Sequence, residues 1–141
     1  MTRAAVKLAA PLLAGLLVGC TALQPPPPVP PPTESVVALL ERPAERALVN
    51  GLRWYEEGAF ERAEQSFRTA VLQQPRDRRD LAVAHKYLAF IACAFNRLLE
   101  CEQQFRNAFA ADPTFLLSDA EIGHPVWGPV YRKVAVQRKP G

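Results

Sequence analysis

The stretch GLRWYEEGAFERAEQSFRTAVLQQP, residues 51–75, is repeated in outline by AFIACAFNRLLECEQQFRNAFAADP, residues 89–113. The two stretches align without a gap at a constant shift of 38 residues. Each carries small and large apolar residues at the same positions and closes on a proline. The matched pairs are Gly51 with Ala89, Phe60 with Leu98, Ala63 with Cys101, Phe67 with Phe105, Ala70 with Ala108, and Pro75 with Pro113. A constant shift over six positions indicates an internal repeat.

Each repeat has the composition of two helices joined by a turn. Good helix formers dominate from Ser35 onward, and no run alternates apolar and polar residues for long enough to form a strand. Gly58 and Asn96 stand in the predicted turns, and Asn tolerates the left-handed backbone that such turns often need. Residues 78–81 are extra in the second unit, so we expect its first helix to be longer by about one turn.

Close helix packing within each hairpin needs small side chains at the contact. We expect Gly51 to meet Ala63 in the first hairpin, and Ala89 to meet Cys101 in the second.

The segment after Pro113 is predicted to cover the apolar end that two hairpins leave open. Ser118 and Glu121 have the spacing of a capping box at the start of a short helix. Pro125 fits the first position of a last helix, which carries Trp127 on its apolar side.

The pattern over residues 44–113 resembles the tetratricopeptide repeat, a helical hairpin of about 34 residues with small contact residues and a closing proline. The resemblance implies an all-α domain of two hairpins plus a C-terminal capping helix, residues 35–141. It also implies a partner-binding scaffold whose concave face is lined by the first helix of each unit. Carried over by position, the lining is Glu45, Leu48, Leu52, Tyr55 and Glu56, then Val83, Lys86, Phe90, Cys93 and Ala94.

An apolar groove rimmed by Glu and Lys suits a bound peptide or a partner helix. In the alternative interpretation, the helix from Pro125 folds back into this groove and its lining becomes core.

The first nineteen residues have the layout of a secretory leader, because Arg3 and Lys7 precede an apolar run over residues 8–18. That run is too short to span a bilayer, which takes about 20 residues. Its end, LVGC at residues 17–20, resembles the lipobox of bacterial lipoproteins. The resemblance implies cleavage before Cys20 and covalent attachment of diacylglycerol and an N-acyl chain there. Thr21, where retained lipoproteins have Asp, implies an outer-membrane anchor with the domain facing the periplasm.

Residues 20–34 form a linker whose prolines, at 25–28 and 30–32, favour a polyproline II spacer over a helix or a sheet strand. A PxxP ligand for a partner is the alternative use of this segment.

Cys93 and Cys101 remain after Cys20 is lipidated, in a compartment where disulfides form. They are either plain core residues or a disulfide that pins the second hairpin. A metal site with His85 is not expected, because the eight-residue step from His85 to Cys93 is not a zinc spacing and no close Cys pair exists.

Charge and motifs exclude two classes of function. Without the leader the chain carries fifteen basic and fourteen acidic residues and no basic run, so nucleic acid is not an expected partner. The two histidines, His85 and His124, come with no phosphate loop or nucleophile elbow. We therefore expect no enzyme, no small-molecule substrate, no metal and no cofactor besides the lipid.

The tail sequence GHPVWGPVYR, residues 123–132, resembles small lipoproteins associated with type VI secretion systems, the TssQ family. That resemblance implies an accessory role at the membrane-anchored base of a contractile injection machine, with envelope proteins as partners. A pilotin, which escorts a secretin or pilus subunit to the outer membrane, is the competing interpretation.

Overall fold

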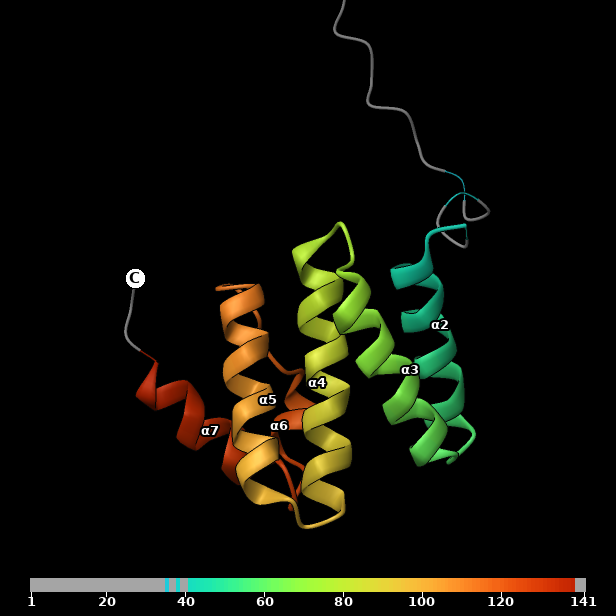
Figure 1. The fold of residues 1–141 in the computed structure, drawn as a ribbon. Helices are drawn as coiled ribbons and strands as arrows, with labels where there is room; N and C mark the ends of the chain where they lie inside the picture. Colours follow the sequence, from blue (N-terminus) through green and yellow to red (C-terminus); the bar gives the residue numbers. More distant parts are fainter. Residues whose placement is uncertain (1–34, 36–37, 39–40, 139–141) are drawn as a thin grey trace, which may run out of the picture. The chain divides into compact units, whose positions relative to one another are not determined.

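The described part of the computed structural model comprises Ser35, Ala38 and residues 41–138, which all belong to one unit, Thr33–Gly141. The predicted leader (residues 1–19), the lipidation site Cys20 and the linker up to residue 34 lie outside the described residues. The helices, labelled as in Figure 1, are α2 (Pro43–Glu56), α3 (Phe60–Gln73), α4 (Arg78–Ala94), α5 (Leu98–Ala111), α6 (Asp119–Ile122) and α7 (Gly128–Gln137).

Four of these helices form two antiparallel hairpins, α2 with α3 and α4 with α5 (Figure 1). The hairpins stack through α3 and α4, and α7 packs against α5 and α6. No strand occurs among the described residues, which confirms the predicted all-α fold of two hairpins followed by C-terminal helices. Within the same residues, no helix combines the length and the apolar character needed to cross a bilayer.

The two hairpin turns are built in the same way. Gly58 and Asn96 both adopt a left-handed backbone, with φ of 74° and 58°. In the first turn, the amide of Ala59 donates to the Trp54 carbonyl at 2.8 Å, and the Arg97 amide repeats this bond to Ala92 at 2.8 Å. These bonds satisfy carbonyls at a helix end, as in a Schellman motif. The repeat in sequence is therefore a repeat in backbone geometry, and the prediction for Asn96 is confirmed.

Helix α4 has 17 residues, whereas α2, α3 and α5 have 14 each. It begins at Arg78, and the Asp77 side chain caps it by accepting the Arg79 amide at 2.8 Å. The expected extra turn is thus confirmed, and it extends the first helix of the second unit.

The close contact in the first hairpin differs from the predicted one. A Cβ built on Gly51 would lie 2.6 Å from Cε1 of Phe67 and 2.7 Å from its Cδ1, closer than to any atom of Ala63. The nearest neighbour of an added methyl is thus Phe67, and the expected contact of Gly51 with Ala63 stays a prediction. Glycine is needed because the fully buried Phe67 ring lies against the α2 backbone, where a methyl group at position 51 would overlap it.

Two apolar clusters form the core. The first, between α2, α3 and α4, centres on Phe67, and the second, between α4, α5, α7 and the connecting segment, centres on Phe105. Tyr55 and Tyr87 pack against both clusters, with their ring centroids 4.8 Å apart. The aromatic rings therefore make the core continuous from one hairpin to the next.

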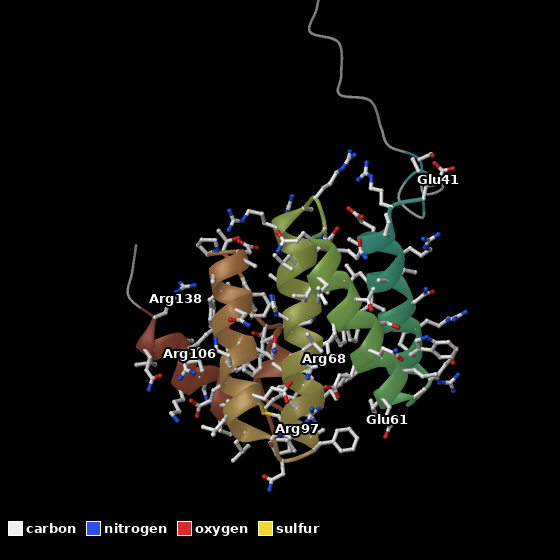
Figure 2. The ribbon with its side chains drawn as sticks, viewed as in Figure 1. Glu41, Glu61, Arg68, Arg97, Arg106 and Arg138 are labelled. Carbon is white, nitrogen blue, oxygen red and sulfur yellow. A yellow bond between two sulfur atoms is a disulfide. The ribbon has the colours of Figure 1, made fainter. Side chains whose placement is uncertain are left out.

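Charged side chains join the two hairpins near their turns. Both oxygens of Glu64 on α3 accept hydrogen bonds from Arg97, at 3.0 and 2.7 Å, and Arg68 bridges Glu64 and Glu100. Figure 2 shows the labelled Arg68 and Arg97 at this junction. The hydrogen bonds from Arg97 hold the pKa of Glu64 below its ordinary value.

We expect His85 to make the domain less stable at acidic pH. This residue is buried on α4, with its Nδ1 2.7 Å from Oε1 of Gln104 on α5, and burial lowers its pKa below the ordinary 6.5. As the pH falls through 6.5, the unfolded chain takes up a proton that the folded chain resists, so the free energy of unfolding decreases. Urea unfolding at about pH 7.5 and about pH 5.5 measures this loss, which a His85→Gln variant should show less strongly. An equal loss in the variant would remove His85 as its source.

The structure of the C-terminal segment confirms the predicted capping box but differs from the predicted start of the last helix. The Ser118 hydroxyl oxygen accepts a hydrogen bond from the Glu121 amide, and the Glu121 carboxylate accepts one from the Ser118 amide at 2.9 Å, which is the predicted capping box. The last helix, however, begins at Gly128 and not at Pro125. Residues 124–127 form a turn instead, closed by the Gly128 amide on the His124 carbonyl at 3.0 Å.

Candidate partner-binding surface

The second half of the predicted groove is covered by the chain's own C-terminal segment. Phe90 is only 2% exposed, because the Trp127 ring stacks on it with centroids 4.3 Å apart. Beside this stack, Lys86 Nζ binds Glu121 Oε1 at 2.7 Å. The prediction that Lys86 and Phe90 line an open groove is therefore wrong. Covering them buries the large apolar face that two repeats alone leave in water.

This cover is held by contacts within the C-terminal segment itself. Trp127 Nε1 donates to the Glu121 carbonyl at 3.0 Å, and the His124 ring stacks on Trp127 at 3.3 Å between centroids. A Cβ on Gly128 would lie 2.2 Å from the Ile122 carbonyl oxygen, so a larger residue would push the two chain segments apart. The glycine and the tryptophan of the tail thus have a shared structural role, which is to close residues 121–128 over α4.

Two of the predicted groove residues on α2 are buried inside the domain. Glu45 is 7% exposed, and its Oε1 accepts the Arg76 amide at 3.1 Å and pairs with Arg42 at 3.7 Å. Leu48 belongs to the buried cluster around Phe67. Their assignment to a partner groove is therefore wrong, because the bend before α4 brings Arg76 over this end of α2.

The remaining predicted positions stay at the surface. Leu52, Tyr55 and Val83 are half-buried and Glu56 is exposed, while Tyr87 continues the same apolar row on α4. We call these five residues the open strip. Burial, followed by the nearby Tyr87 and Glu121, raises the pKa of the Tyr55 hydroxyl, so it is a neutral hydrogen-bond donor at physiological pH. The strip therefore offers an apolar surface with a tyrosine donor and an acidic edge.

Tyr87 is a surface residue that sequence analysis missed, and Trp127 was placed on the last helix but not over Phe90. The helical spacing of Tyr87 from Val83, four residues, places both on one face of α4 and was a usable signal. For Trp127 no such signal exists, because its partner Phe90 lies on another element.

The two buried cysteines form a disulfide. Cys93 near the end of α4 and Cys101 on α5 are joined with their Cα atoms 5.2 Å apart. Of the two interpretations of this pair, the structure shows the one that pins the second hairpin. Such a bond is consistent with a domain outside the cytoplasm. Within the described residues, no group of three His, Cys, Asp or Glu side chains is arranged to hold a metal ion.

Comparison with known proteins identifies no relative: no family model, no curated protein and no solved structure matches this chain. The architecture itself is that of an all-helical domain of paired helices.

Proposed function

We propose that this protein is a lipid-anchored scaffold of the bacterial envelope that binds another protein through the open strip and serves a type VI secretion system. The observation that carries the proposal is the contrast between two parts of the predicted groove. The chain covers Phe90 on α4 with its own Trp127, whereas Leu52 and Tyr55 on α2 and Val83 near the start of α4 stay partly exposed. Apolar groups and a tyrosine hydroxyl on a rigid helical pair are suited to hold a peptide or a partner helix.

Three features of the protein support the outer-membrane location and the role in type VI secretion. The leader and the lipobox-like end at Cys20 support lipid anchoring at the outer membrane. The disulfide between Cys93 and Cys101 supports a periplasmic domain. The tail over residues 123–132 supports the type VI assignment through its likeness to the TssQ family.

Crosslinking in native membranes tests this proposal. The wild type, a Leu52→Glu/Val83→Glu variant and a matched Leu72→Glu/Leu99→Glu control are compared by mass spectrometry of the proteins recovered with each. Leu72 and Leu99 are 80% and 86% exposed on α3 and α5, so the control adds the same charge elsewhere. We expect type VI baseplate or membrane-complex proteins with wild type and control, and at least about a tenfold loss with the strip variant.

The fold of each variant is checked by circular dichroism before the comparison. Retention of all partners by the folded strip variant would show that the open strip is not the binding surface. A secretin or pilin among the partners, together with loss of secretin multimers on deletion, would replace the type VI role with that of a pilotin.

A further inference from the structure

A recess lies between α5 and α7, and none of its lining residues belongs to the open strip. It has a volume of about 300 Å³. Its lining is Arg106, Phe109, Ala110, Val134, Gln137 and Arg138. We call it the α5–α7 groove.

The floor of the α5–α7 groove is apolar and recessed. Phe109 and Val134 are 7% and 2% exposed, and Ala110 forms an exposed wall beside them. A recess of about 300 Å³ has room for a projecting leucine or phenylalanine side chain. The shape therefore favours a partner that inserts a side chain.

The rim of the α5–α7 groove is basic. Figure 2 shows the labelled Arg106 and Arg138 at the edge of the domain formed by α5 and α7. The Arg138 guanidinium lies 4.8 Å from the Phe109 ring centroid and donates to the Pro113 carbonyl at 2.8 Å, so it is held over the floor. Glu102 accepts Arg106 at 2.9 Å and also pairs with Lys133.

The sequence shows that this excess of positive charge continues along the tail. From Ile122 to the last residue the chain contains no Asp or Glu, but it contains Arg132, Lys133, Arg138 and Lys139. The mature chain is expected to be near neutral, so residues 122–141 carry an excess of positive charge that the rest of the chain balances. Charge complementarity therefore selects an acidic partner.

We propose that the α5–α7 groove binds an acidic amphipathic helix of a partner protein. One apolar side chain of that helix fills the recess against Ala110 and Val134, beside the Arg138 guanidinium that covers Phe109. Carboxylates on either side of it pair with Arg106 and Arg138. A helix is the fitting occupant because α5 and α7 end the stack, and a further helix laid against them continues the packing by which the hairpins themselves associate. This surface is separate from the open strip and does not depend on it.

A designed peptide tests the proposal on the purified full chain. The probe is a helix of about 14 residues with a leucine stripe flanked by glutamates, and its control carries glutamine in place of each glutamate. Binding is measured by calorimetry and mapped by amide chemical shifts. We expect the acidic peptide to bind more tightly than its control, to weaken with added salt, and to shift the amides of Phe109, Ala110 and Val134.

Two variants separate the charge of the rim from the shape of the floor. Arg106→Glu/Arg138→Glu should weaken binding of the acidic peptide about tenfold, whereas the matched Arg46→Glu/Arg53→Glu variant on α2 keeps it. Ala110→Trp, which fills the recess from an exposed position without changing charge, should also abolish binding. The Leu52→Glu/Val83→Glu variant should bind the peptide as wild type does, so this test stands apart from the previous one.

Several results would overturn the proposal. Equal binding of the acidic and glutamine peptides would remove the role of the basic rim, and amide shifts confined to α2 and α3 would place the site elsewhere. Binding to phosphatidylglycerol vesicles through Arg106 and Arg138, without binding of the peptide, would assign this face to a membrane surface instead.

Discussion

Replacing Phe67 with alanine should lower the free energy of unfolding by about 3–5 kcal/mol, the range for deleting a buried phenylalanine side chain. The ring is 0% exposed, stacks on Tyr87 with centroids 5.2 Å apart, and lies against the backbone at Gly51. Its loss therefore leaves a cavity between three helices that the glycine has no side chain to fill. Urea unfolding, followed by circular dichroism at about 222 nm where helices absorb, measures the change in the free energy of unfolding.

Leu72→Ala on the same helix is the matched control, because Leu72 is 80% exposed and its loss should cost no more than about 0.5 kcal/mol. A Gly51→Ala/Phe67→Leu cycle tests the contact itself. If the methyl group that Gly51→Ala introduces clashes with the ring, the smaller side chain of Phe67→Leu should relieve part of the cost of Gly51→Ala, and the two effects will not add. Additive effects would show that the two positions are independent.

Removing the disulfide with a Cys93→Ala/Cys101→Ala variant should lower the free energy of unfolding by about 2–3 kcal/mol. The bond closes a short loop, because the cysteines are eight residues apart. Closing a loop of that length lowers the conformational entropy of the unfolded chain, which stabilises the fold by about 2–3 kcal/mol. The pair also holds α4 to α5 beside the turn at Asn96. Unfolding of the variant and of the wild type is compared with and without a reductant.

Reduction should destabilise the wild type to about the level of the variant and leave the variant unchanged. Alkylation of the unfolded, unreduced wild type followed by mass spectrometry gives an independent check. Modification of Cys93 and Cys101 before reduction would contradict the disulfide.

Local sequence rules were sufficient for the helices and their turns. The shift of 38 residues placed Gly58 and Asn96 in equivalent turns and residues 78–81 as an added turn of helix. The three-residue spacing of Ser118 and Glu121 predicted a capping box, and the structure confirms each of these features. These features depend on the backbone preferences and hydrogen bonds of residues close in the chain. Such preferences are read directly from residue type and spacing.

The surface open to partners could not be predicted in the same way. By spacing alone, Phe90 and Leu52 occupy comparable positions on the first helix of their units. Trp127 covers Phe90, whereas Leu52 stays near the surface. The spacing of residues along α4 does not predict the contact between Phe90 and Trp127. The same holds for Glu45, which becomes internal because the Arg76 amide reaches it from 31 residues away.

The sequence by itself thus determined the repeated helical hairpins, because their pattern depends on 3.6-residue periodicity, small contact residues and turn formers. Only the tertiary structure decided which parts of the predicted groove are core, that Phe67 lies in the space at Gly51, and that a basic recess lies between α5 and α7. These outcomes depend on the stacking of helices from separate parts of the chain. The burial of a side chain is set by everything packed over it, and not by its own helix alone.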